Sequence, residues 1–127
     1  MIALGRHLLL ELFGCDPEVI NNLEAVKSAM LGAAKRANAA IAEVVFHEFN
    51  PFGISGFVVI AKSHLSIHTW PEYEYAAVDI LSCGENIRVE AAASYLMGQF
   101  KPKRTSVVEL KRGTFLGLVS WRPSPDL

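Results

Sequence analysis

The reactive residue types of this chain are concentrated in one segment, KSHLSIHTWPEYEYAAVDILSCGE, which spans residues 62–85. Residues 64–70 are predicted to form a strand, in which alternate side chains share a face. The polar and aromatic members of the segment then form one row: His64, Ser66, His68 and Trp70. Because buried polar groups must be paired, this row indicates either a hydrogen-bonded edge or interface, or an active site.

Three generic chemistries can be compared with this segment. His64 and His68 are four residues apart, roughly 13 Å along a strand, which is too far for one metal ion and argues against a zinc hydrolase. A nucleophile pair of Cys83 and His68 is compatible with the residue types, but two common residues carry little specificity. The GISG stretch lacks the lysine and the spacing of a phosphate-binding loop. The residue types alone therefore leave the chemistry open.

The composition fits one globular domain. The chain has 127 residues, of which 51% are hydrophobic, and its formal net charge is −1. This charge gives no basic field for nucleic acid. The local cluster of Lys101, Lys103 and Arg104 is interpreted as a solvated helix end and turn.

The first residues and the cysteines bear on the cellular compartment. The apolar start is interrupted by Arg6, His7 and Glu11, and no secretory signal or membrane-spanning run is evident. Cys15 and Cys83 are expected to be free thiols in a reducing cytoplasm, while a disulfide between them stays open as the alternative. We therefore expect a cytoplasmic protein without a membrane partner.

Periodicity and turn residues predict the elements that position the reactive segment. One helix is expected from the capping residue Asp16 to Asn38, and a second from the capping residue Asn86 to Phe100. The tail SWRPSPDL is expected to be a loose end. Strands are expected at residues 2–13, 41–49, 54–61, 64–70, 75–82 and 105–111.

This order of elements predicts an α+β fold. The expected form is a two-layer sandwich, with a largely antiparallel sheet carrying both helices on one face. The strands FVVIA and AAVDIL have apolar residues on both faces. In a sheet with one solvated face, apolar and polar residues alternate more regularly along each strand. We therefore expect a partner subunit to cover the second face.

Six stretches occur together in a distinctive order between Gly5 and Gly113: GRHLLLEL with GCD, FHEF with PFGISG, SHLSIHTWPE, YAAVD, SCGE and ELKRG. On these stretches the chain resembles the small prokaryotic S-adenosylmethionine decarboxylases, which are pyruvoyl enzymes made as self-cleaving proenzymes. The resemblance implies that two protomers pack sheet to sheet into an αββα dimer. It also implies production of decarboxylated S-adenosylmethionine, the aminopropyl donor for spermidine synthesis, without a metal.

The resemblance implies the following processing chemistry. The Ser63 hydroxyl attacks the carbonyl of Lys62, elimination breaks the chain, and a pyruvoyl group then caps the new chain. Ser55 and His68 assist this step. The single domain of residues 1–127 would become a β chain of residues 1–62 and an α chain of residues 63–127.

Further roles are implied for the mature enzyme. The pyruvoyl ketone condenses with the substrate amine as a Schiff base, and Cys83 returns a proton to the α-carbon. Phe49 matches an aromatic residue that stacks on adenine, and Glu72 matches the acid that binds the ribose hydroxyls. Trp70 lines either the same pocket or the subunit interface.

Two positions depart from the family pattern and keep alternatives open. Lys62 stands where the family usually has Glu, which allows an unprocessed relative that pairs with and regulates an active decarboxylase. Glu74 stands where the family commonly has Gly, and an extra carboxylate would suit a basic amino acid such as arginine or ornithine as substrate.

Overall fold

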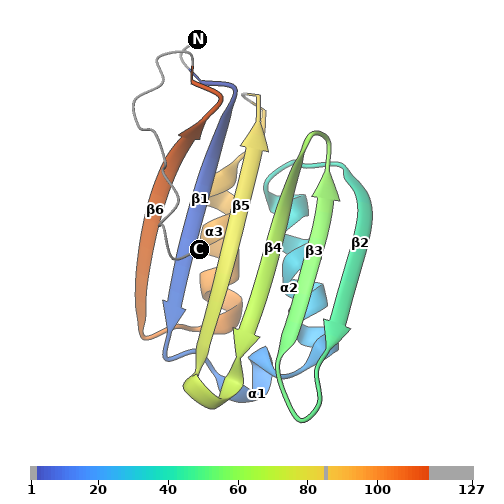
Figure 1. The fold of residues 1–127 in the computed structure, drawn as a ribbon, viewed down its shortest axis with the longest axis vertical. Coiled ribbons are helices and arrows are strands. Elements are labelled where there is room, and N and C mark those ends of the chain that lie inside the picture. The colour runs from blue at the N-terminus through green and yellow to red at the C-terminus, as the bar shows by residue number, and fades with distance from the viewer. Residues whose placement is uncertain (1–2, 85, 115–127) are drawn as a thin grey trace, which may run out of the picture.

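A six-stranded antiparallel sheet forms one layer of the molecule (Figure 1). The computed structural model describes residues 3–84 and 86–114, so the tail predicted to be loose lies outside the described residues. The strand order is β2-β3-β4-β5-β1-β6, in which β1 is inserted between β5 and β6. The strands are β1 Gly5–Phe13, β2 Ile41–Glu48, β3 Ile54–Ile60, β4 Ser63–Trp70, β5 Tyr75–Cys83 and β6 Arg104–Arg112.

The helices form the second layer, behind the sheet in Figure 1. They are α1 (Pro17–Ile20), α2 (Leu23–Arg36) and α3 (Val89–Phe100), and η1 (Pro71–Tyr73) is a single 3-10 turn. Strand residues of one parity are buried beneath the helices, as in β5, where every second side chain from Ala76 to Ser82 is buried. The predicted α+β sandwich is confirmed. Its other face, which we call the open face, carries no helix of residues 3–84 or 86–114.

The central position of β1 places this strand between β5 of the reactive segment and β6. Gly5 at the start of β1 lies opposite Cys83 at the end of β5, and on its other side it lies opposite Arg112 of β6. A Cβ atom at Gly5 would be 2.7 Å from the carbonyl oxygen of Ser82. Glycine is therefore required for β1 to approach the end of β5 this closely.

The prediction of one continuous helix from Asp16 to Asn38 is wrong. The helix breaks after Ile20, and α2 begins anew because the Asn22 side chain accepts a hydrogen bond from the Ala25 N–H at 2.9 Å. Asn21, between the two helices, makes a tertiary contact instead: its Oδ1 accepts a hydrogen bond from the Gly53 N–H at 3.1 Å. The Asp16 cap is confirmed, since Oδ1 accepts from the Glu18 N–H at 3.0 Å.

The predicted start of the last helix is also wrong, whereas its end is confirmed. Arg88 takes the N-cap position of α3 without a side-chain hydrogen bond, and Asn86 remains exposed outside the helix. The helix ends at Phe100, and Lys101 follows in the left-handed conformation with φ 51°.

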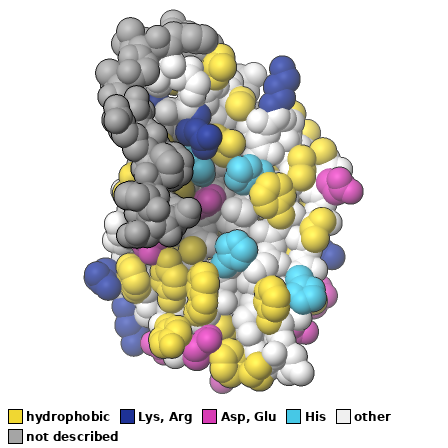
Figure 2. Space-filling model, viewed as in Figure 1, with side chains coloured by type: hydrophobic (Ala, Val, Ile, Leu, Met, Phe, Trp, Pro, Cys, Tyr) yellow, Lys and Arg dark blue, Asp and Glu magenta, His cyan; other side chains and the backbone are white. Residues whose placement is uncertain are grey.

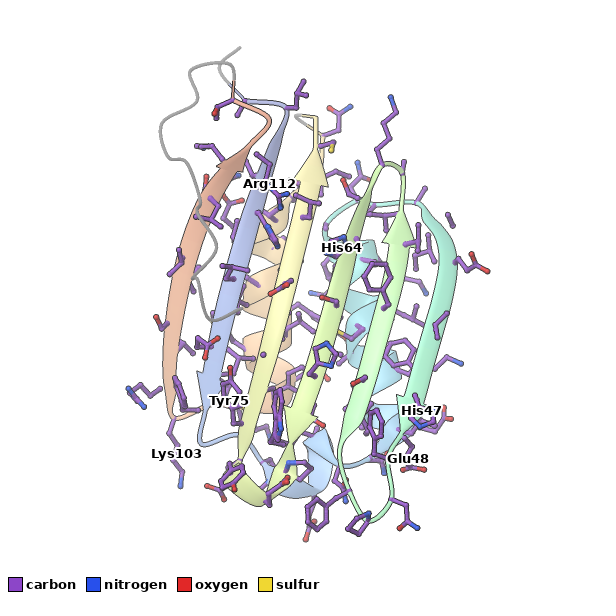
Figure 3. The ribbon with its side chains drawn as sticks, viewed as in Figure 1. His47, Glu48, His64, Tyr75, Lys103 and Arg112 are labelled. Carbon is purple, nitrogen blue, oxygen red and sulfur yellow. The ribbon has the colours of Figure 1, made fainter. Side chains whose placement is uncertain are left out.

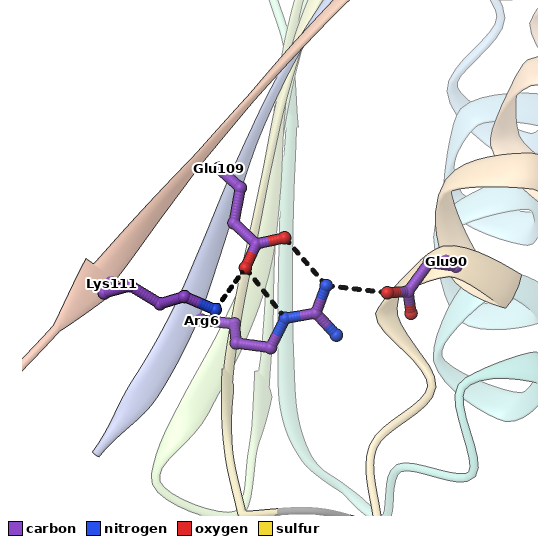
Figure 4. A network of polar contacts seen from close by, with 4 residues as sticks. All are labelled: Arg6, Glu90, Glu109 and Lys111. Atoms are coloured by element: carbon purple, nitrogen blue, oxygen red, sulfur yellow. Dashed lines mark hydrogen bonds and ion pairs between the residues drawn. The ribbon is translucent and has the colours of Figure 1, made fainter. Parts of the chain in front are cut away.

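A network of charged groups ties β1 to its neighbours on the helix side of the sheet (Figure 4). Arg6 donates to Glu90 of α3 at 2.6 Å and to both carboxylate oxygens of Glu109 on β6, at 2.7 and 3.1 Å. Lys111 also donates to Glu109 at 2.7 Å. These partners lower the pKa of Glu109 to about 2, with Arg6 as the largest cause. Because the groups are exposed to solvent, the network contributes mainly to the relative placement of β1, β6 and α3.

The break between α1 and α2 yields a stability prediction. Asn22→Ala should lower the free energy of unfolding by about 1 kcal/mol because the N–H groups at the start of α2 lose their cap. Asn22→Ser should retain most of that stability. Denaturant unfolding measures the effect, and Asn86→Ala is the control, expected to change the free energy by less than about 0.5 kcal/mol. An equal loss in the two alanine variants would contradict the assignment of the cap.

Candidate active site

The β3–β4 hairpin places Ser63 at the first position of β4. Ile60 pairs with Ser63, so the turn consists of only Ala61 and Lys62. Lys62 has a φ of 59°, in the left-handed region that residues with a side chain rarely occupy. Ser63 is 7% exposed, and its hydroxyl has no hydrogen-bond partner among the described residues. The buried Ser63 hydroxyl, which could act as a nucleophile, therefore directly follows a residue with a constrained backbone, Lys62.

Cys83 approaches the same peptide unit from β5. Its thiol donates a hydrogen bond to the carbonyl oxygen of Lys62, with 3.2 Å between sulfur and oxygen. A donor at this oxygen withdraws electron density from the carbonyl carbon and stabilises negative charge that develops there. The structure thus brings together Lys62, Ser63 and Cys83, which were singled out from the sequence.

Ser55 and His68 form a second pair on the open face. The two residues lie opposite each other on β3 and β4, and Ser55 Oγ shares a 2.6 Å hydrogen bond with His68 Nδ1. A shallow pocket of about 170 Å³ surrounds the pair, lined also by Val45, His47, Gly56 and Phe57. This arrangement orients an imidazole beside a hydroxyl, as a proton-transfer pair requires.

Within one chain, the two groups of residues remain apart. His68 follows Ser63 by five positions on β4, roughly 16 Å at the rise of a strand. The two side chains also differ in parity, since Ser63 points to the helix side and His68 to the open face. The structure therefore does not bring His68 and Ser55 to Ser63.

The predicted substrate-binding residues lie still farther from Ser63. Trp70 ends β4, roughly 23 Å from Ser63 at strand rise, and Phe49 directly follows β2 at the same end of the sheet, the lower end in Figure 1. Phe49 is half-exposed, with its ring edge against His47 at 4.5 Å between centroids. Glu72 is exposed in η1 and lines a separate pocket of about 480 Å³ with Phe52.

A row of stacked rings crosses the open face at this end, and sequence reasoning missed most of it. Tyr75 stacks between Trp70 and Phe13, with 5.3 and 5.2 Å between centroids, and Arg104 lies over Phe13 at 4.2 Å. The Tyr75 hydroxyl donates to Glu11 at 2.5 Å. Burial, followed by the Glu11 carboxylate, raises the pKa of Tyr75 to about 12. Trp70 thus belongs to an aromatic row on the open face.

A polar cluster at the other end of the open face was also missed. Arg112 donates to His7 Nδ1 at 3.0 Å, and because arginine has no acceptor, His7 must carry its proton on Nε2. That Nε2 lies 3.8 Å from a carboxylate oxygen of Asp79. His64 lies edge-on to His7 and stacks on Phe57. Burial, with His7 as the next cause, lowers the pKa of His64. Figure 3 shows His64, Tyr75 and Arg112 on this face.

A signal for both missed groups was present in the alternation of β1 and β5. His7 and Glu11 share one parity of β1, as Tyr75 and Asp79 share one parity of β5. Pairing of these two strands puts both sets on the open face. The adjacency of β1 and β5 was not predicted, so the polar sets were not connected.

The remaining sequence questions concern Cys15 and Glu74. Both cysteines are free, and they lie near opposite ends of the β1–β5 pair, which excludes the disulfide alternative. Burial, with a contribution from Glu74, raises the pKa of Cys15 to about 11. Glu74 is exposed with φ 53° at the end of η1, a conformation that glycine adopts without penalty.

The open face combines these polar groups with exposed apolar side chains. Figure 2 shows hydrophobic side chains and imidazoles gathered over the strands. The exposed apolar members on this face are Val45, Phe57, Trp70, Val108 and Leu110. In the part of the chain that the structure describes, no helix is long and apolar enough to cross a bilayer.

Two solved structures resemble this chain in fold. The crystal structure of the adenosylmethionine decarboxylase from Aquifex aeolicus matches with a TM-score of 0.84 and 34% identity, covering 98% of this chain and 99% of that one. The Trypanosoma brucei AdoMetDC monomer matches with a TM-score of 0.63 at 17% identity, over 82% of this chain and 45% of that one, which shows a shared fold. The domain thus has the adenosylmethionine decarboxylase fold.

The sequence comparisons identify the family. A family model described as S-adenosylmethionine decarboxylase matches residues 6–113, and the chain belongs to this family. An S-adenosylmethionine decarboxylase proenzyme from Thermodesulfovibrio yellowstonii is 61% identical over 113 residues, 89% of this chain and 84% of the relative. A proenzyme of the same name from Clostridium kluyveri is 46% identical over 124 residues, 98% of each chain.

Proposed function

We propose that this chain is a proenzyme that breaks its own backbone before Ser63 and then decarboxylates S-adenosylmethionine. The observation that carries the proposal is the hydrogen bond from the Cys83 thiol to the Lys62 carbonyl, next to the buried Ser63 hydroxyl, which has no partner within the described part of the chain. Membership of the S-adenosylmethionine decarboxylase family supports the choice of substrate.

Self-cleavage proceeds by transfer of an acyl group. The Ser63 oxygen forms a bond to the Lys62 carbonyl carbon, the peptide C–N bond breaks, and the hydroxyl proton passes to the released nitrogen. Elimination then expels the Lys62 carboxylate as the α-hydrogen of Ser63 is lost. One water replaces the nitrogen, which leaves as ammonia, and position 63 becomes a pyruvoyl group. The Cys83 hydrogen bond stabilises the oxyanion of the first step.

The site fits a pyruvoyl group at position 63. The Ser63 hydroxyl is buried and bonds to no residue that the structure describes, and the Cys83 thiol bonds to the adjacent Lys62 carbonyl. A pyruvoyl ketone supplies an electron sink for decarboxylation of an amine-bearing substrate. Once the bond before position 63 is broken, the Cys83 thiol is released from Lys62 and can deliver a proton to the substrate α-carbon.

Substrate recognition is assigned to the predicted residues at the lower end of the sheet. Phe49, half-exposed and held edge-on by His47, offers a ring face for stacking on adenine. The exposed Glu72 carboxylate accepts hydrogen bonds from two neighbouring ribose hydroxyls. Trp70 supports this end of the face through its stack on Tyr75.

The spacing of these groups favours a homodimer with shared active sites. Ser63 and Cys83 lie at one end of β4 and β5, whereas His68, Ser55 and the substrate-binding residues lie nearer the other end. Packing of two open faces about a twofold axis perpendicular to the strands places each end of one sheet against the opposite end of its partner. Each site would then combine Ser63 and Cys83 of one protomer with Ser55 and His68 of the other. Exposed Val45, Phe57 and Val108 supply apolar area for the contact.

We also place the protein in the reducing cytoplasm. Both functions assigned to Cys83 require a free thiol. Cys83 and Cys15 are free cysteines in the structure and form no disulfide with each other. A reducing compartment keeps such thiols available.

Mass spectrometry and a decarboxylation assay test the proposed activity. The purified wild-type protein should consist of chains 1–62 and 63–127, with the second chain lighter than its unmodified sequence by the mass of ammonia. It should release carbon dioxide from S-adenosylmethionine and not from arginine or ornithine. Ser63→Ala should stay intact and inactive, while the control Ser66→Ala, on the open face of the same strand, should cleave normally.

Three outcomes would contradict this assignment in different ways. An intact wild-type chain with unmodified Ser63 would exclude the pyruvoyl group. Preference for arginine or ornithine would establish the basic amino acid alternative and give Glu74 a part in it. An intact chain that binds a second, active decarboxylase would identify a regulatory relative.

Complementation between two inactive variants tests the shared site. His68→Ala alone should cleave about a hundredfold or more slowly because it loses a proton-transfer group. Coexpression with Ser63→Ala should restore cleavage to roughly half of the His68→Ala chains, since a mixed dimer contains one complete site. Distinct tags separate the chains. Absence of restored cleavage in a demonstrated mixed dimer would place the complete site within one protomer.

A further inference from the structure

We infer that the left-handed backbone of Lys62 strains the uncleaved hairpin, holds the carbonyl against Cys83, and accelerates self-cleavage through release of that strain. The inference rests on the proposed self-cleavage and assigns Lys62 as a positioning residue that acts through its backbone. Its side chain is exposed and takes no part.

The hairpin gives Lys62 no freedom to relax. Ile60 pairs with Ser63 directly at the base of the turn, and Val59 pairs with His64 one step further. Two residues must therefore reverse the chain, and Lys62 does so with φ 59°. A residue with a Cβ atom is disfavoured in that region, whereas glycine is not. The turn thus retains a conformation that its sequence does not favour, directly before the bond to be broken.

Three other residues with side chains share a positive φ, and all of them end a helical turn. Asn38 follows α2, Glu74 follows η1, and Lys101 follows α3. Their N–H groups bond to helical carbonyls of Lys35, Pro71 and Met97 at 3.0, 3.0 and 2.9 Å. A left-handed residue commonly ends helices in this way. Among the described residues with a side chain, Lys62 alone has a positive φ in a strand hairpin.

The reaction itself releases this constraint. Transfer of the Lys62 acyl group from nitrogen to the Ser63 oxygen breaks the C–N bond of the turn and leaves an ester link that is one atom longer. After elimination, Lys62 is a chain end, and its φ is free to return to the favoured region. Strain that begins to be released as the C–N bond breaks lowers the barrier to acyl transfer. Cys83 fixes the direction in which the strained carbonyl faces.

Substitution by glycine separates the backbone from the side chain. Lys62→Gly should slow self-cleavage about fivefold, equivalent to about 1 kcal/mol in the barrier. Lys62→Gln removes the charge but keeps the Cβ atom, and it should cleave at the wild-type rate. Lys101→Gly is the matched control: it relieves a left-handed lysine far from the hairpin and should leave the cleavage rate unchanged. The uncleaved fraction is followed by mass spectrometry after cell-free synthesis of the full chain.

A second measurement detects the strain without cleavage. In a Ser63→Ala background, which keeps the chain intact, Lys62→Gly should raise Tm by a few degrees. An unchanged or lower Tm would overturn the inference. The inference would also be overturned if Lys62→Gly cleaved as fast as the wild type, or if Lys62→Gln slowed cleavage as much as Lys62→Gly. In each of these cases the proposed self-cleavage itself would remain valid. A wild-type chain that never cleaves would instead overturn the proposed function on which the inference rests.

Discussion

The contact between the Cys83 thiol and the Lys62 carbonyl depends on the register of three strands. Pairing of β4 with β5 brings the end of β5 beside the β3–β4 turn, and pairing of β1 with β5 holds that end in place. Gly5 permits the close approach of β1, and Arg6 then anchors the same strand to β6 and α3. A one-residue slip of β5 would turn Cys83 to the helix side and remove the donor from the carbonyl.

The same regularity that aligns Cys83 also separates the remaining groups. A strand cannot fold its ends together, so Ser63 and His68 on β4 are held far apart by the rise of the strand. The helices cover one face and leave the polar and apolar groups of the other face without a cover in the chain described. The proposed twofold partner would resolve both features at once, because it would bury the apolar residues and supply the distant histidine. In such a dimer, catalysis and assembly would depend on the same surface.

The sequence predicted what depends on local periodicity and did not predict what depends on tertiary contacts. The open-face parity of His64, Ser66, His68 and Trp70 follows from alternation alone and is confirmed. The break after Ile20 was missed because Asn21 leaves the helix for Gly53, 32 positions later. Arg112 and His7 meet through β6 pairing with β1, which no local pattern encodes. The distance between Ser63 and His68 could have been predicted from the sequence, because a predicted strand fixes the rise per residue.

The two departures from the family pattern have different physical consequences because both fall on left-handed residues. At Glu74, a side chain replaces the glycine that this conformation favours, and backbone bonds from Cys15 and to Pro71 hold the turn. At Lys62, one residue with a Cβ atom replaces another, so the backbone penalty of the hairpin is unchanged and only an exposed charge is reversed. The proposed self-cleavage uses the carbonyl of residue 62 and the strain inferred for it, and neither depends on the sign of the side chain. We therefore expect the substitution to leave self-cleavage intact.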